Sequence, residues 1–422
     1  MEMTRVQLAQ GVNLTYLPAR KFKTSLLSAQ FVTPLRQETA GANALLAAVL
    51  RRGTVSCPDM GTLSARMDNL YDASIDYTVR KKGENQCVGF VASFIDDRYA
   101  PSGEHLLEPV AELLGELVCD PVTYHGRFVP EYFDSEKSNL LEAIRSIIND
   151  KRDWADSRLL RTLCAGEPYA VPRLGDEETV DKLQALRVYD QYRQLISTAP
   201  LEIIYSGSAD LERVRLALAA AFATLPREEV RMISAAVPHV GRETVQYVED
   251  ALDVTQGKLG MGFSCGSSDM PALLMGNTLF GGSSNSKLFL NVREKLSLCY
   301  YASSLYHRQK GLITVSSGIE FQNYQRAYDE IMAQLEAVQK GELEDWELEG
   351  ARSTLLNSYA TVGDSQGKLE NFYLGQAATG QTETPEALAR AIETMTADRI
   401  CQAMETVRLD TVYFLKGKEV EA

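Results

Sequence analysis

Alternating apolar and polar residues near the start of the chain predict two half-buried strands, at residues 13–17 and 26–32. Further along, apolar residues recur every three or four positions, first over residues 106–117 and later over residues 324–338. That period is typical of amphipathic helices, and Gly341 is a natural C-terminal stop for the second of them. The pattern therefore predicts a mixture of strands and helices.

The two halves of the chain repeat one another weakly. Each half closes with a predicted helix that leads into a strand, at residues 201–205 and 409–413, and a glycine soon follows each strand. Each half also contains a Lys-Gly turn suited to joining two strands, at residues 82–83 and 310–311. These echoes indicate that the second half repeats the plan of the first.

A length of 422 residues exceeds what a single hydrophobic core usually supports, so two domains are expected. Residues 226–244 carry two prolines, mixed charges and no sustained period, which is typical of a linker. We therefore predict an N-terminal domain over residues 1–225 and a C-terminal domain over residues 245–422. Strands and helices alternate without the regular rhythm of a doubly wound sheet. The expected class is α+β, with antiparallel-rich sheets flanked by helices.

The composition is that of a soluble globular protein, with 45% apolar and 24% charged residues and no apolar run near the roughly 18 residues that span a bilayer. The first residues lack a basic segment followed by an apolar one, so we expect a cytoplasmic location and no membrane contact. A net charge of -14 argues against a nucleic-acid partner, because phosphate binding needs clustered Lys and Arg. The seven cysteines are scattered and never spaced C-x-x-C, which favours buried thiols over disulfides or a zinc ribbon.

The histidines are too few and too scattered for a common zinc motif. A catalytic zinc usually takes three protein ligands, and two of them are often histidines close together on one helix. The histidines of this chain are His105, His125, His239 and His307. His105 stands at the start of a predicted helix and His125 in a loop, so surface or capping roles account for both.

Residues 262–266, Gly-Phe-Ser-Cys-Gly, match the short G-x-S-x-G pattern that places a nucleophilic serine on a strand-to-helix turn. In α/β-hydrolases an acid and then a histidine follow that serine. Here the histidine that follows Ser264 is His307, which leaves little room for the intervening strands. An independent serine hydrolase that uses Ser264 therefore stays as an alternative to a plain strand and turn.

The segment from Thr278 to Tyr301 is the most specific part of the sequence. It contains Gly281-Gly282, a Ser-Ser-Asn cap, Lys287-Leu288-Phe289 and then Arg293-Glu294-Lys295-Leu296-Ser297-Leu298-Cys299-Tyr300. This segment resembles the C-terminal half-domain of the pitrilysin/insulinase family, which includes mitochondrial processing peptidase and reads L-G-G-x-x-S-S-R-L-F…R-E-K-x-G-L-x-Y. Lys287 stands for the usual arginine and Ser297 for the usual glycine. Without the family, the same residues predict a capped amphipathic helix followed by a strand.

The resemblance implies a substrate-binding role for the residues that match. Arg293 and Tyr300 fall on the family's Arg/Tyr pair, which binds the substrate backbone near the scissile bond, and Gly281 and Gly282 belong to the same segment. We expect Arg293 and Tyr300 to lie side by side. The alternative is that Arg293 pairs with Glu294 or a neighbouring acid and that Tyr300 packs in the sheet.

The resemblance also implies that the zinc site is lost. The family motif H-x-x-E-H is followed within a few residues by Gly-Thr, and counting back from Gly53-Thr54 puts alanine at all three chemical positions: Ala44, Ala47 and Ala48. Ala143 falls on the third ligand position, and Glu142, one residue away, points about 100° around the helix. Alanine is the best helix former, so these helices would survive the loss of the ligands. The alternative is that these four alanines are ordinary core residues, which would give the same sequence pattern.

The resemblance thus implies an inactive bacterial member with the LuxS/MPP-like metallopeptidase fold, forming half of a clamshell. Such a chain would have no catalytic or metal-binding residues and no cofactor of its own. It would bind an unfolded peptide and supply its Arg/Tyr pair to a zinc-bearing paralogous subunit in a heterodimer, with a homodimer when alone. The alternatives are a structural scaffold, like the core proteins of respiratory complexes, and the serine hydrolase considered above.

Overall fold

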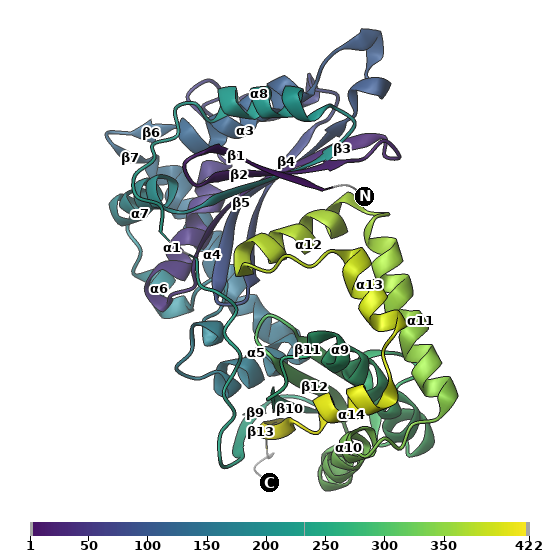
Figure 1. Ribbon diagram of the computed structural model, residues 1–422. Coiled ribbons are helices and arrows are strands. Elements are labelled where there is room, and N and C mark those ends of the chain that lie inside the picture. Colours follow the sequence, from purple (N-terminus) through teal and green to yellow (C-terminus); the bar gives the residue numbers. More distant parts are fainter. Residues whose placement is uncertain (1–2, 232, 419–422) are drawn as a thin grey trace. The chain divides into compact units, whose positions relative to one another are not determined.

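The computed structural model describes residues 3–231 and 233–418 as two compact units, each assembled from three segments of the chain (Figure 1). Unit 1 comprises Met1–Arg145, Val171–Ala235 and Gly363–Thr382. Unit 2 comprises Ser146–Ala170, Ala236–Val362 and Glu383–Ala422. Each unit is built around one sheet.

The sheet of unit 1 has six strands in the order β1-β2-β8-β3-β5-β4. Their bounds are Thr4–Ala9 (β1), Val12–Pro18 (β2), Thr24–Pro34 (β3), Ser74–Lys82 (β4), Asn85–Ile95 (β5) and Leu201–Gly207 (β8). Neighbours are antiparallel except β2 and β8, which run parallel. The strand β4 forms one edge.

The sheet of unit 2 has five strands in the order β11-β12-β10-β13-β9. Their bounds are Gln246–Leu252 (β9), Gly257–Cys265 (β10), Cys299–His307 (β11), Leu312–Ile319 (β12) and Val407–Gly417 (β13). Only β9 and β13 are parallel. If β1 is set aside, the two sheets have the same strand order and directions, so the topology repeats as the echoes in the sequence suggest. The edge strand β11 of unit 2 thus corresponds to β4 of unit 1.

Helices cover both faces of the sheet in unit 1. On one side lie α1 (Gln37–Leu50), α3 (Leu107–Cys119) and α7 (Ala185–Thr198), and on the other lies α12 (Gln366–Thr379), yellow-green in Figure 1. The central strand β3 needs this double cover, because eight consecutive residues are buried, so that side chains on both of its faces are shielded from water. The buried Glu370 of α12 accepts hydrogen bonds from Ser28 at 2.7 Å and from Arg80 at 2.6 Å.

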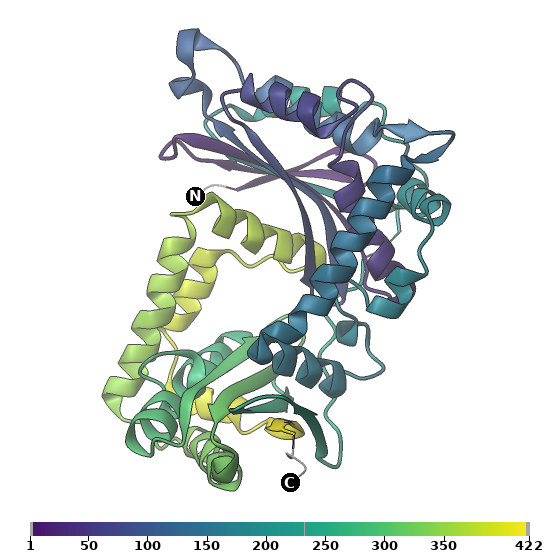
Figure 2. The ribbon, with the colours of Figure 1, turned by 180° about the vertical axis from the view of Figure 1, so that it is seen from behind.

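Unit 2 follows the same principle. One face of its sheet is covered by α5 (Lys151–Leu163), which lies against β10 and β13 and is blue against the green strands in the view from behind (Figure 2). A Cβ atom on Gly262 of β10 would come within 2.7 Å of the Leu163 side chain, so glycine lets the helix pack closely. The other helices of this unit include α9 (Met270–Asn277), α10 (Tyr324–Gln339), α11 (Asp345–Val362), α13 (Pro385–Glu393) and α14 (Ala397–Met404).

The compact units differ from the continuous halves expected over residues 1–225 and 245–422. The segment that contains α5 belongs to unit 2, and the one that contains α12 belongs to unit 1. Each unit therefore takes a covering helix from the other half of the sequence. Local patterns cannot reveal this exchange, because the helices pair with strands more than ninety residues away in the chain.

Most predicted elements are confirmed. Residues 106–117 and 324–338 lie in or beside α3 and α10, and Gly341 adopts a positive φ of 73° just after the latter. In the predicted linker, the described residues from 226 to 244 form no helix or strand. The predicted class, with mostly antiparallel sheets flanked by helices, is confirmed. Among the described helices, none combines the length and the apolar character that a membrane span requires.

Candidate functional site

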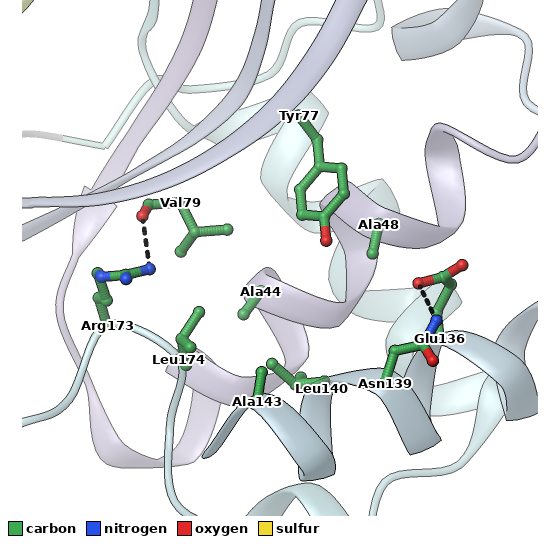
Figure 3. A pocket seen from close by; sticks show the side chains of 10 residues that line it. All are labelled: Ala44, Ala48, Tyr77, Val79, Glu136, Asn139, Leu140, Ala143, Arg173 and Leu174. Carbon is green, nitrogen blue, oxygen red and sulfur yellow. Dashed lines mark hydrogen bonds between the residues drawn. The ribbon is translucent and has the colours of Figure 1, made fainter. Parts of the chain in front are cut away.

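Three of the alanines at the expected zinc positions surround one cavity of about 320 Å³ in unit 1 (Figure 3). Ala44 and Ala48 come from α1, and Ala143 comes from α4 (Pro130–Ser146). Ala47 is buried on α1 but is not among the described residues that line the cavity. The register counted from Gly53-Thr54 thus brings together positions almost one hundred residues apart in the sequence.

Three polar side chains that line this cavity already have partners: Glu136, Asn139 and Arg173. Glu136 accepts a hydrogen bond from the Asn139 amide at 3.2 Å and forms an ion pair with Arg52 at 3.0 Å. Arg173 donates to the backbone carbonyl of Val79 at 3.3 Å. Figure 3 shows the Tyr77 side chain pointing toward the helices that carry the alanines.

The donors at this cavity do not fit a zinc ion. Zinc in a catalytic site takes three protein ligands with nitrogen, sulfur or carboxylate oxygen donors. Alanine side chains have no lone pairs, and Glu136 supplies the carboxylate among the described lining residues. Glu142, the acid next to the third ligand position, is exposed and is not among them.

The edge strand β4 borders the same cavity, since Tyr77 and Val79 line it. Two carbonyls of this strand accept hydrogen bonds from arginines, Ile75 from Arg51 and Val79 from Arg173. Such side-chain partners are one way in which proteins protect an open sheet edge. Sequence reasoning missed Tyr77 and Arg173, because neither stands in a motif.

A second cavity, of about 410 Å³, lies in unit 2 beside the other edge strand, β11. Arg293, Gly281 and Gly282 line it. Arg293 lies on the π-helical segment η6 (Leu288–Lys295), with its guanidinium 4.7 Å from the centre of the Phe289 ring. It also forms an ion pair with Glu294 at 3.3 Å. Glu294 is the partner expected if Arg293 has no substrate-binding role.

Tyr300 is not among the described residues that line this cavity, whereas Tyr301 is. The Tyr300 side chain is exposed, and its hydroxyl donates to Glu320 at 2.7 Å. That hydrogen bond is the main reason why the pKa of Tyr300 lies above its usual value. Arg293 and Tyr300 therefore do not both line this cavity, and their expected side-by-side placement stays a prediction.

A β-bulge decides which tyrosine faces the cavity. Cys299 pairs with Ile319 and Tyr301 with Gly318, so Tyr300 is the extra residue of β11. Just before the strand, Ser297 adopts a φ of 50°, in the left-handed region that favours glycine. Spacing along the sequence cannot predict this change of face, because one extra residue reverses every following side chain.

The two glycines of the matching segment have a packing role. A Cβ atom on Gly281 would come within 2.7 Å of the Ser304 backbone nitrogen, and one on Gly282 within 2.9 Å of the Asn277 amide nitrogen. Both glycines therefore permit close approach of backbone and side chains at the end of η5 (Thr278–Gly282). Lys287, which stands for the family arginine, is buried and bonds Glu347 at 3.0 Å.

The G-x-S-x-G match is not a nucleophile elbow. Ser264 lies inside strand β10, paired with Leu312 on one side and Arg408 on the other, rather than on a strand-to-helix turn. The ring nitrogens of His307 contact the Tyr169 hydroxyl at 3.0 Å and the Thr314 hydroxyl at 2.9 Å. The serine hydrolase alternative therefore loses the geometry that it needs.

The remaining histidines have structural surroundings. His105 is exposed, with Nδ1 3.1 Å from Asp97, and His125 adopts a φ of 50° in the turn between two short strands. His239 is buried between two carboxylates, with Nδ1 2.6 Å from Glu167 and Nε2 3.3 Å from Asp410.

His239, Cys164 and Glu167 bring potential metal-ligand atoms within 4.8 Å of one another, which sequence spacing did not suggest. The buried ammonium group of Lys310 contacts Glu167 and opposes a cation there by charge repulsion. Burial raises the pKa of Asp410, but hydrogen bonds from Thr411 and Arg242 outweigh it and hold that pKa below its usual value. We interpret this cluster as a charge network that fastens the segment around His239 to the sheet.

Comparisons with known proteins give consistent results. The family model described as "Peptidase M16 inactive domain" matches residues 182–355. A Bacillus subtilis (strain 168) protein named "Probable inactive metalloprotease YmfF" is 35% identical over 416 residues, which are 97% of this chain and 96% of that protein. A zinc protease of Streptomyces coelicolor, named as uncharacterized, is 27% identical over 240 residues, which are 54% of this chain and 52% of its own.

Solved structures share the fold over the whole chain. A conserved protein from Enterococcus faecalis V583 superposes with a TM-score of 0.90 at 28% identity, covering 100% of both chains. A peptidase M16 inactive domain from Pseudomonas fluorescens has a TM-score of 0.79 at 16% identity, over 100% of this chain and 99% of that one. At that identity the likeness shows the fold alone.

Proposed function

This chain belongs to the pitrilysin/insulinase (M16) metallopeptidase family as an inactive member, and from this premise we propose that it is the non-catalytic, peptide-binding subunit of a heterodimeric zinc peptidase. The zinc would belong to a paralogous partner that carries H-x-x-E-H, and the substrate would be an unfolded peptide. The cytoplasm is the expected compartment, and a homodimer is the expected assembly when the partner is missing.

The observation that carries this proposal is an edge strand beside each cavity. Tyr77 and Val79 of β4 line the cavity of unit 1, and residues 301–304 of β11 line the cavity of unit 2. An extended peptide can add to a sheet edge through main-chain hydrogen bonds, which recognise the backbone more than the sequence. At β4 the peptide would have to displace Arg51 and Arg173 from the carbonyls that they now bind.

Arg293 and Tyr300 are the side chains that would be offered to the partner's active site. Both can donate hydrogen bonds to a peptide carbonyl and to the oxyanion that develops on it, which helps only if they are held opposite the zinc. Arg293 is at the cavity already. Tyr300 would first have to exchange its hydrogen bond with Glu320 for one with the substrate.

The test is peptide cleavage by the purified pair, with the partner identified by co-purification from the native cell. The Arg293→Ala/Tyr300→Phe variant should lower turnover by roughly 10²-fold or more, as loss of an oxyanion donor does. Arg161→Ala, an exposed arginine on α5, is the matched control and should cleave like the wild type.

The second candidate function is a structural scaffold, favoured by the hydrogen bond that already occupies the Tyr300 hydroxyl. Unchanged turnover of the double variant in an assembled complex would support the scaffold and refute the substrate-handling role.

A further inference from the structure

The cavity of unit 2 is cationic in a protein that is acidic as a whole. The charged residues among its described lining are Arg152 and Arg293, with no carboxylate among them, while the full chain carries a net charge of -14. Arg152 comes from α5 and Arg293 from η6. Two arginines from separate elements therefore line one cavity of about 410 Å³.

Both guanidinium groups are oriented by aromatic rings. Arg152 lies 4.4 Å from the ring centre of Tyr301, and Arg293 lies 4.7 Å from that of Phe289. Stacking uses the flat face of a guanidinium and leaves its in-plane N–H donors for hydrogen bonds, so less conformational freedom is lost when an anion binds. Arg152 already directs one donor to the Ser303 hydroxyl, at 3.2 Å, on the edge strand β11.

The carboxylate partners of these two arginines leave some of their N–H donors free to bind an anion. Asp156 is 4.0 Å from Arg152, and Glu294 is 3.3 Å from Arg293. A guanidinium has five N–H donors, and a carboxylate binds at most two of them in a bidentate pair. Ser283 and Ser284 add hydroxyl groups to the lining without adding charge.

We propose that this cavity binds a carboxylate group of the peptide, held between Arg152 and Arg293. The inference rests on the proposed peptide-binding function and names the substrate class: peptides that present an acidic side chain or a free C-terminus. A peptide that pairs with β11 passes Tyr301 and Ser303, and so brings its carboxylate to the cavity. Arg152 is thereby a specificity-determining residue outside the segment that resembles the family pattern.

The experiment measures the affinity of the full-length chain for three peptides of one sequence. The first has a C-terminal amide and no acid, the second has a free C-terminal carboxylate, and the third has a C-terminal amide and one internal Glu. At least one of the two acidic peptides should bind about tenfold more tightly than the neutral one, the gain expected for charge-assisted hydrogen bonds. The acidic peptide that binds more tightly shows whether the carboxylate comes from the C-terminus or from a side chain.

Arg152→Gln and Arg293→Gln should each remove that preference, while the control Arg161→Gln, with the same loss of charge on α5, should retain it. Circular dichroism of each variant checks that the fold is intact. Equal affinity for all three peptides, or a preference that survives Arg152→Gln, would overturn the carboxylate inference and leave peptide binding standing. Failure of every peptide to bind would overturn both.

Discussion

At Ser297 the backbone enters the left-handed region, with φ at 50°, where the family pattern has glycine. Residues with a Cβ atom pay on the order of 1 kcal/mol or more in this conformation, whereas glycine does not. The residue ends the turn between η6 and β11, so it sets how the strand that carries Tyr300 and Tyr301 begins.

Replacing Ser297 with glycine should therefore stabilise the protein. We expect Ser297→Gly to raise the free energy of unfolding by about 0.5–1 kcal/mol, the relief of strain being partly offset by the freer unfolded chain. Urea denaturation measures the change. Ser297→Ala keeps the Cβ atom and should bring no gain, so equal stability of the two variants would contradict this account.

At the scale of elements, α1 and α4 both line the cavity of unit 1, at positions where the resemblance to the family predicts zinc ligands. Ala44 and Ala48 are one helical turn apart and share a face, while Ala143 reaches the same cavity from α4. Ala47, about 100° around α1 from Ala48, is not among the described residues that line it. The helices thus retain an arrangement that three ligands could use.

Restoring ligands at these positions should create a zinc site. We expect the Ala44→His/Ala48→His/Ala143→Glu variant to bind about one equivalent of zinc after dialysis and the wild type to bind none, because three donors in one cavity suffice for the metal. The matched control, Ala44→His/Ala47→His/Ala143→Glu, moves one histidine to a position that does not line the cavity and should bind none.

Metal analysis decides between these outcomes. Zinc in the control as well would show that the register counted from Gly53-Thr54 is wrong. Zinc in the wild type that is lost in His239→Ala would instead point to the cluster of Cys164, Glu167 and His239.

At the scale of the whole molecule, the exchange of α5 and α12 makes each unit depend on both halves of the sequence. In unit 1, Ser28 of β3 bonds Glu370 of α12, although more than three hundred residues separate the two elements. Leu26 and Val32, on the same face of β3 as Ser28, are buried as well. Leu369, Tyr373 and Leu374 of α12 are buried too. A chain that ends at residue 225 would leave this face of its sheet exposed.

We therefore expect residues 1–225, expressed alone, to bind a hydrophobic dye and to lack cooperative unfolding, because large exposed apolar faces cause both. Adding a peptide of residues 363–382, which includes α12, should restore cooperative thermal unfolding. The same peptide with Leu374→Lys should fail to do so, because the buried site has no partner for the charge. Cooperative folding of residues 1–225 without any peptide would refute this interpretation.

Much of the local structure was predictable from the chain alone. The period of apolar residues in 106–117 and 324–338 indicates α3 and α10 because a helix buries one stripe whatever covers it. Lys-Gly turns at 82–83 and 310–311 indicate hairpins because Gly83 and Gly311 take positive φ values of 57° and 62°. The segment around Arg293 and the alanines opposite H-x-x-E-H likewise indicate the family and the loss of its ligands.

By itself the sequence thus determined the main elements, the repeat and the family, all of which depend on residues close together in the chain. Only the tertiary structure decided that α5 belongs to unit 2 and α12 to unit 1. It also decided that Tyr301 rather than Tyr300 lines the cavity of unit 2, together with Arg152 and Arg293. These outcomes depend on burying the second face of a sheet and on one bulged residue. Neither feature produces a local periodicity in the sequence, because packing, and not residue spacing, determines the contacts between distant segments.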